Sequence, residues 1–341
     1  MLTTNRSTPW FVASVVALMT LVVIDMRVRL WSPAPARLPE QFSSTCLDLI
    51  VRRLASQQAK TIVVGDSVLW GYKLSESQNV IARLHSRLPI ARFENLAFEG
   101  GSPPNSAIVV RHLVHRGVPI HAVLFNINQK EFNVADSAYR TLLPSLARVA
   151  STDLSPTDRM QLDPKMLFDR RGSVEQLADR YWRWYGLRVD LRERIFGADD
   201  AASAILRFTQ RLSGESARAE AAHRFTADRF LGTYDLAPLD KRNVGLIYLR
   251  SLIAELCAKH IPALGFLTPT NHTLLADYID SPEYEANLKT SATLATCPSV
   301  RIVNLDRAIP ANEFIDNDHL TPRGNEHLAR LLAPYLQGIT Q

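Results

Sequence analysis

The stretch TIVVGDS, residues 61–67, decides the fold class. Its first four residues are all β-branched, and the turn-forming triplet Gly65-Asp66-Ser67 follows them directly. A continuous run of this kind is typical of a strand that is buried on both faces in a parallel sheet. The carboxyl ends of such strands border the crevice where ligands bind. Ser67 is therefore a candidate nucleophile, although Gly-Asp-Ser is also ordinary turn chemistry.

Strand and helix patterns alternate on both sides of a long central segment. The expected strands cover residues 60–66, 91–97, 121–128, 262–269 and 300–306. The expected helices cover residues 75–88, 104–117, 238–260, 281–295 and 323–336. This alternation predicts an α/β fold with a doubly wound, parallel, five-stranded sheet. The central segment interrupts it and predicts a helical insertion at about 130–239, where Tyr181, Trp182, Trp184 and Tyr185 cluster.

Composition places the chain among globular proteins. It has 341 residues, of which 46% are hydrophobic and 21% are charged, and its net charge is +5. These values argue against extensive disorder. Lys and Arg are scattered and no basic run is interleaved with aromatic residues, so nucleic acid is not an expected partner.

The N-terminus carries a long apolar segment. Residues Pro9–Ile24 contain no charge, and the apolar character continues to Trp31, which approaches the roughly 20 residues that cross a bilayer. We expect a single-pass membrane anchor over residues 1–31, with a cleaved signal peptide and a buried core helix as the alternatives. A Pro-rich linker and a first helix are expected over residues 32–59, and the main domain over residues 60–337.

Charges beside the anchor and the family resemblance described below give opposite orientations. Arg27, Arg29 and Arg37 follow the apolar segment, whereas Arg6 precedes it. Taken alone, the positive-inside rule leaves the main domain in the cytoplasm.

The chain has three cysteines, Cys46, Cys257 and Cys297, so at most one disulfide can form within it. Cys257 ends a helical pattern and Cys297 precedes a strand in the same half of the chain. A bridge between these two is compatible with an oxidising compartment. Their spacing does not resemble a zinc site, and no metal or organic cofactor is expected.

Polar residues follow the predicted strands at the same edge of the sheet as Ser67. They include Gly100 after the second strand, Asn128 after the third, and the pair Asp316-x-x-His319 before the last helix. A serine hydroxyl needs a base, which His319 can supply, and that imidazole needs an acceptor on its other nitrogen, which Asp316 can supply. These residues together predict acyl-transfer chemistry.

The remaining roles have candidates as well. The backbone N–H groups of Ser67 and Gly100 and the side-chain amide of Asn128 are expected to form an oxyanion hole. Asp318 is the alternative third member of the triad. Asn271 and His272, past the fourth strand, are candidate substrate contacts.

At these residues the chain resembles the SGNH, or GDSL-type, hydrolase superfamily. The Ser, Gly, Asn and His of that family's four blocks match Ser67, Gly100, Asn128 and His319 in order and in strand context. The resemblance covers roughly residues 60–130 and 240–337. The third block departs from the family pattern Gly-x-Asn-Asp, because this chain reads Asn-Ile-Asn-Gln.

A finer resemblance comes from the N-terminal anchor, the insertion and the stretch FLTPTNH after the fourth strand. In these features the chain looks like membrane-anchored SGNH proteins that accompany polytopic membrane-bound O-acyltransferases in teichoic-acid D-alanylation and alginate acetylation. The resemblance implies an enzyme of the cytoplasmic (inner) membrane whose catalytic domain is periplasmic or otherwise extracytoplasmic. It implies transfer of an acyl group, preferably acetyl, through Ser67 to an envelope polysaccharide. A carbohydrate esterase or lipase and an inactive partner of a membrane acyltransferase are the alternatives.

Overall fold

The structure is a computed structural model. It describes residues 8–30, 44–136 and 226–340, together with the single positions or short runs 38, 42, 142–143, 145–147, 149, 182, 185 and 187–188.

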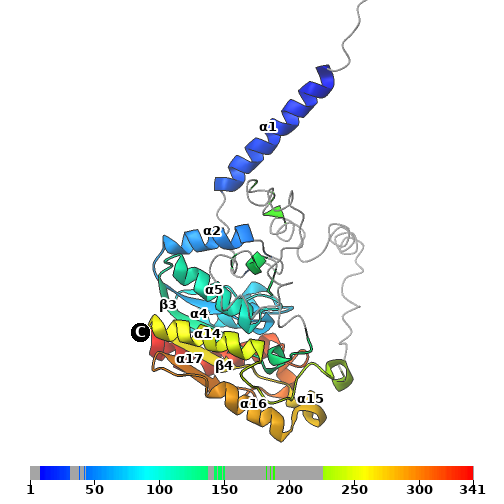
Figure 1. The fold of residues 1–341 in the computed structure, drawn as a ribbon, viewed down its shortest axis with the longest axis vertical. Helices are drawn as coiled ribbons and strands as arrows, with labels where there is room; N and C mark the ends of the chain where they lie inside the picture. Colours follow the sequence, from blue (N-terminus) through cyan, green and yellow to red (C-terminus); the bar gives the residue numbers. More distant parts are fainter. Residues whose placement is uncertain are drawn as a thin grey trace, which may run out of the picture.

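Five parallel strands form one sheet at the centre of the main domain (Figure 1). The strands are β1 (Lys60–Val64), β2 (Phe93–Asn95), β3 (Ile120–Ile127), β4 (Ala263–Leu267) and β5 (Val300–Asn304). Their order is β2-β1-β3-β4-β5, so the direction of winding reverses between β1 and β3. Ligands of open α/β sheets bind beside this reversal, at the carboxyl ends of the strands. The α/β class and the parallel five-stranded sheet predicted from sequence are confirmed.

Helices connect the strands and cover the sheet. They are α2 (Ser44–Ala55), α4 (Val80–Arg87), α5 (Pro103–His115), α14 (Val244–Ala258), α15 (His272–Ile279), α16 (Pro282–Ala292) and α17 (Pro322–Thr340). Helix α4 packs against α17, and α5 packs against α14. Helix α4 connects β1 to β2, and α5 connects β2 back to β3 on the other side of β1. Because both crossovers are right-handed, the two helices lie on opposite faces of the sheet. This arrangement is compatible with a doubly wound fold.

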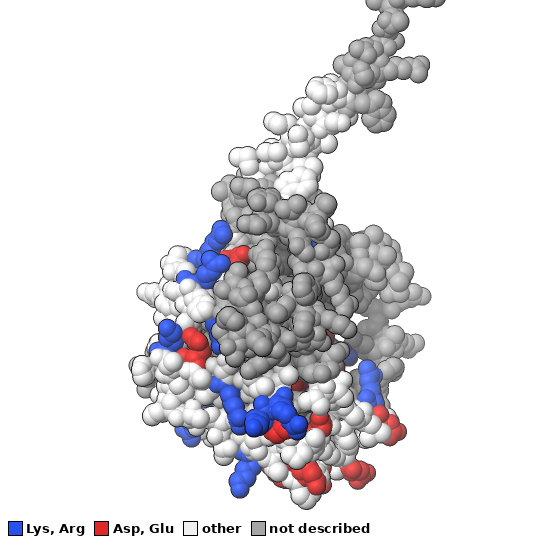
Figure 2. Space-filling view, in the orientation of Figure 1, with Lys and Arg blue, Asp and Glu red and all other residues white. Residues whose placement is uncertain are grey.

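The β-branched run of β1 lies in the hydrophobic core. Ile62, Val63 and Val64 are at most 1% exposed. Helix α2 contributes a buried apolar stripe that includes Leu47 and Ile50. On the face seen in Figure 2, the described basic and acidic side chains are interspersed.

One predicted boundary and one missed helix needed correction. Helix α14 begins at Val244 rather than near residue 238, because the Asn243 side chain accepts the backbone N–H of Leu246 and caps the helix there. Helix α15 was not predicted; its eight residues begin at His272, shortly after β4 ends at Leu267.

Helix α1 (Thr8–Leu30) projects away from the main domain (Figure 1). Most of its described apolar side chains are exposed, among them Phe11, Val16 and Met19. Within the described part of the chain, no helix is both long enough and apolar enough to span a membrane. The anchor over residues 1–31 therefore stays a prediction.

Most of the insertion predicted at 130–239 lies outside the described residues. Its described ends contain the short 3-10 helices η2 (Gln129–Phe132) and η3 (Ala227–Phe230). In the aromatic cluster, Trp182 and Tyr185 are described, whereas Tyr181 and Trp184 are not.

Cys257 and Cys297 form a disulfide, as their places in the sequence suggested. The bond joins the end of α14 to the segment that enters β5. Cys46 is a free thiol that is buried in α2. The disulfide closes a loop of 40 residues and so restricts the unfolded chain.

Reduction of the disulfide is expected to destabilise the domain. Closing a loop of this length is worth about 3–4 kcal/mol in the free energy of unfolding. Urea unfolding of the wild type in reductant should match that of C257S/C297S, and reductant should not affect the double variant. Equal midpoints for the oxidised and reduced wild type would contradict the expectation.

Candidate active site

The turn after β1 presents Ser67 at the carboxyl edge of the sheet. Gly65 has φ +148°, and a Cβ at this position would lie 1.9 Å from the side-chain oxygen of Asn126, so only glycine fits. Asp66 then caps the four-residue helix α3 (Ser67–Trp70) by accepting the backbone N–H of Val68 at 2.8 Å. The turn holds Ser67 as the first residue of this helix, with 6% of its surface exposed.

Ser67, His319 and Asp316 form a continuous hydrogen-bonded relay. The Oγ atom of Ser67 lies 2.8 Å from Nε2 of His319. On the opposite side of the ring, Nδ1 lies 2.8 and 2.9 Å from the two carboxylate oxygens of Asp316. Nucleophile, base and acceptor therefore have the geometry that activates a serine hydroxyl.

Asp316 is held in place by the backbone of its own loop. Its Oδ1 accepts the N–H groups of His319 at 2.9 Å and of Asp318 at 3.2 Å. Asn271 supports the same loop from the start of α15, because its side-chain amide donates to the carbonyl oxygen of Asp316 at 3.1 Å. These bonds fix the carboxylate before any substrate arrives.

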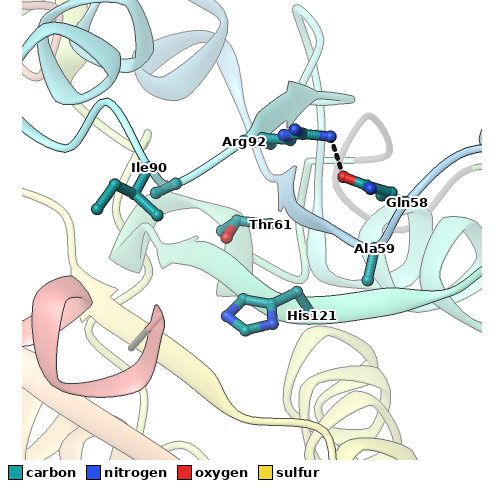
Figure 3. Close-up of a pocket in the computed structure, with 7 residues that line it drawn as sticks. Gln58, Ala59, Thr61, Ile90, Arg92 and His121 are labelled. Atoms are coloured by element: carbon teal, nitrogen blue, oxygen red, sulfur yellow. Dashed lines mark hydrogen bonds between the residues drawn. The ribbon is translucent and has the colours of Figure 1, made fainter.

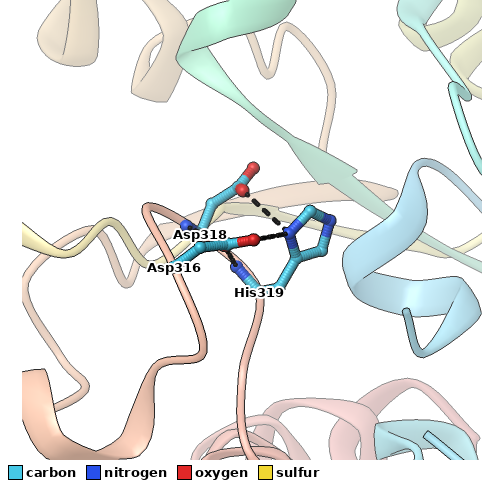
Figure 4. A group of neighbouring side chains, drawn as sticks. All are labelled: Asp316, Asp318 and His319. Atoms are coloured by element: carbon cyan, nitrogen blue, oxygen red, sulfur yellow. Dashed lines mark hydrogen bonds and ion pairs between the residues drawn. The ribbon is translucent and has the colours of Figure 1, made fainter. Parts of the chain in front are cut away.

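Asp318, the alternative third member, also approaches the imidazole (Figure 4). Its Oδ1 lies 3.5 Å from Nδ1 of His319, which is farther than either oxygen of Asp316. Its Oδ2 is bound by Lys130 and by the amide of Asn128. Asp316 is therefore the hydrogen-bonded acceptor of the ring, and Asp318 is a second carboxylate behind it.

The surroundings raise the pKa of His319 above its ordinary value. Burial acts to lower the pKa, but the charge of Asp318 and the hydrogen bond that the ring donates to Asp316 outweigh it, while Lys130 opposes the rise. A base must be neutral to accept a proton. The nucleophile is consequently activated only when the pH is above this raised pKa.

The predicted oxyanion donors divide into two groups. The backbone N–H groups of Ser67 and Gly100 make no hydrogen bond to the described residues. The side-chain amide of Asn128, in contrast, donates to Asp66 at 2.8 Å and to Asp318 at 2.6 Å. For Asn128 to donate to an oxyanion, one of these two bonds would have to break. In the structure, Asn128 links the carboxylates of Asp66 and Asp318.

Gly100 and its neighbour Gly101 serve different purposes. Gly100 has φ +72°, a conformation that favours glycine, and space is open around it. Gly101 lies against the turn that carries the nucleophile, because a Cβ there would lie 2.0 Å from the carbonyl oxygen of Gly65. Sequence analysis missed Gly101, although the doubled glycine after β2 was its signal.

Asn271 and His272 were expected to contact substrate, but their polar atoms are bound within the protein. Besides donating to Asp316, Asn271 caps α15 by accepting the N–H of Leu274 at 3.2 Å. His272 lies between the carboxylates of Asp280 and Asp306, with 2.6 Å to each. Their substrate contacts stay a prediction, and the structure gives both residues supporting roles.

Tyr72 is a neighbour of the catalytic ring that the sequence did not reveal. It follows α3, is half-buried, and stacks on His319 with the ring centroids 4.3 Å apart. Lys73, exposed and in the left-handed region at φ +56°, lies over the Tyr72 ring. An aromatic face and a cation therefore border the site beside the imidazole.

A group of metal-ligating atoms and a surface concavity are the other features that could hold a ligand. Donor atoms of Asp316, Asp318 and His319 lie within 4.8 Å of one another, close enough for a metal ion, but the triad and the bond to Lys130 account for their arrangement. A concavity of about 290 Å³ lies at the amino ends of β1 and β3, where Thr61 and His121 line it (Figure 3). It is at the sheet edge opposite Ser67 and holds none of the relay.

Comparison with family models and with curated proteins did not identify a related protein. No family model matches this chain, and no curated protein matches it significantly.

Gly101→Ala should disrupt the nucleophile turn. The new methyl group must displace the backbone of Gly65, and overpacking of this kind costs about 1–3 kcal/mol. We expect at least tenfold slower modification of Ser67 by a serine-directed phosphonate, together with a lower urea midpoint. Gly338→Ala is the matched control, because Gly338 lies in α17 with ordinary backbone conformation and open space around the added methyl group. Equal reactivity of the two variants would contradict this role of Gly101.

Proposed function

We propose that this protein is a serine-dependent O-acyltransferase of the SGNH type, which carries an acyl group, preferably acetyl, on Ser67 and passes it to a hydroxyl of an envelope polysaccharide. One observation carries the proposal: Oγ of Ser67 lies 2.8 Å from Nε2 of an imidazole whose other nitrogen is bound to Asp316. Sequence segments separated by about 250 residues supply these groups, and local turn chemistry does not require their alignment.

The first half of the reaction forms the acyl-enzyme. Oγ of Ser67 attacks the ester carbonyl carbon of the donor, and its proton passes to Nε2 of His319. The N–H groups of Ser67 and Gly100 bind the oxyanion, where one positioned donor is typically worth ~3 kcal/mol of barrier. As the intermediate collapses, the imidazolium gives its proton to the leaving alkoxide, and the acyl group remains as an ester on Ser67.

The second half returns the enzyme to its starting state. A hydroxyl of the acceptor gives its proton to Nε2 of His319 and attacks the acyl carbon. The new oxyanion collapses, the imidazolium protonates Oγ of Ser67, and the acylated acceptor leaves. Water in place of the sugar hydroxyl gives hydrolysis by the same steps, so the acceptor decides between a transferase and an esterase.

One feature supports an extracytoplasmic site of action: the Cys257–Cys297 disulfide is typical of oxidising compartments. The N-terminal anchor in the cytoplasmic membrane is proposed from the apolar sequence of residues 1–31. A polytopic membrane-bound O-acyltransferase is the partner that this arrangement would need to supply acyl groups from the cytoplasm. The partner is proposed from the resemblance described above.

The experiment is intact-mass analysis of the full-length chain after incubation with an activated acetyl ester. We expect one acetyl adduct on Ser67, none on Ser67→Ala, and an unchanged adduct on Ser56→Ala, which replaces an exposed surface serine. Adding an envelope polysaccharide should discharge the adduct into acetylated glycan. Release as free acetate alone would make the protein an esterase, and an adduct that survives in Ser67→Ala would refute the proposal.

A further inference from the structure

Lys130 is buried directly beneath the catalytic loop. It lies in η2, immediately after β3, and only 11% of its side chain is exposed. Its ammonium group forms an ion pair with Oδ2 of Asp318, whose side chain is completely buried. A buried ammonium is costly unless it is paired, so this position requires a reason.

The reason lies in the geometry around His319. Asp316 already accepts from Nδ1, yet Oδ1 of Asp318 lies 3.5 Å from the same nitrogen and has no hydrogen-bond partner among the described residues. Two carboxylates therefore converge on one ring N–H. Two negative charges at this distance favour the imidazolium form, which cannot accept a proton from Ser67.

Lys130 compensates one of these charges. Its ammonium and the amide of Asn128 both bind the oxygen of Asp318 that points away from the ring. The charge of Lys130 acts against the rise in the pKa of His319 that Asp318 causes. Despite its complete burial, Asp318 has a lowered pKa, because the charges of Lys130 and His319 outweigh the cost of desolvation.

We propose that Lys130 is a positioning residue for the catalytic base: its ammonium group pairs with Asp318 and so allows His319 to be neutral and to accept the proton of Ser67. The inference rests on the proposed acyl transfer and assigns it a further functional residue.

The other groups around the ring do not replace Lys130. Burial raises the pKa of Glu131 well above its ordinary value, which favours its neutral form, and burial likewise raises the pKa of Tyr234, so its phenol is neutral near pH 7. Lys73 is exposed to solvent, which screens its charge. The groups that face the cluster are Asp66, Ser67, Tyr72, Lys73, Asn128, Lys130, Glu131, Tyr234, Asp316 and Asp318.

Lys130→Met tests the proposal by removing the charge while keeping an unbranched side chain. We expect acylation of Ser67 to slow at least tenfold at neutral pH and to recover at higher pH. The acid limb of the pH profile should move by about one unit toward higher pH, the size of effect that one nearby charge produces. Lys130→Arg keeps the charge and should leave the limb near its wild-type position. A limb that does not move in Lys130→Met, or moves equally in Lys130→Arg, would overturn the proposal.

A second comparison removes the risk that Lys130→Met fails to fold. In the double variant Lys130→Met/Asp318→Asn both members of the ion pair are neutral, so neither charge is left buried without its partner. Because Lys130 is proposed to act by compensating the charge of Asp318, the acid limb of the double variant should stay near its wild-type position. A limb that moves about one unit toward higher pH in the double variant, as expected for Lys130→Met alone, would overturn the proposal.

A readout that does not depend on activity separates this inference from the proposed function. The pKa of His319 can be measured by NMR titration of its ring protons, assigned with His319→Gln. It should rise in Lys130→Met and stay near the wild-type value in Lys130→Arg. If Ser67 never forms an adduct while the NMR shift is found, the proposed function fails and the role of Lys130 stands. If Ser67 forms an adduct but the pKa of His319 does not change, the proposed function stands and the role of Lys130 fails.

Discussion

The relay of Ser67, His319 and Asp316 depends on the buried carboxylate of Asp66. It caps the helix of the nucleophile and accepts from the side-chain amides of Asn126 and Asn128 at the end of β3. Asn128 in turn binds Asp318, the second carboxylate beside His319. One carboxylate thus connects the turn after β1, the end of β3 and the loop before α17. Within the described part of the chain, the bond between Ser67 and His319 is the only other hydrogen bond that joins the turn after β1 to the loop before α17.

The sheet order explains why these segments meet. Winding reverses between β1 and β3, and the side chains after both strands face the same edge. Asn126, the last polar residue within β3, fills the space that Gly65 leaves open. The fold therefore provides the close backbone approach that the turn at Ser67 needs.

Sequence reasoning could identify the functional residues that belong to short, recognisable sequence patterns. The β-branched run before Ser67 and the Asp-x-x-His spacing predicted the members of the relay from strand ends and a three-residue separation, although Asp318 stayed open as the alternative to Asp316. It could not predict Lys130, since a lysine after a strand is ordinarily solvated and its burial depends on Asp318, 188 positions later in the sequence. The supporting roles of Asn271 and His272 were hidden for the same reason, because their partners come from other parts of the chain.

The central claim is that the relay makes Ser67 a reactive nucleophile, and labelling with a fluorophosphonate tests it without knowledge of the substrate. Peptide mapping should find the label on Ser67, with a rate that falls as the pH drops through the raised pKa of His319, because the protonated ring cannot act as a base. His319→Gln and Asp316→Asn should both slow the labelling, as removal of triad members slows the reactions of known serine enzymes. Labelling that is absent, that occurs at another serine, or that is as fast in His319→Gln as in the wild type would contradict the account.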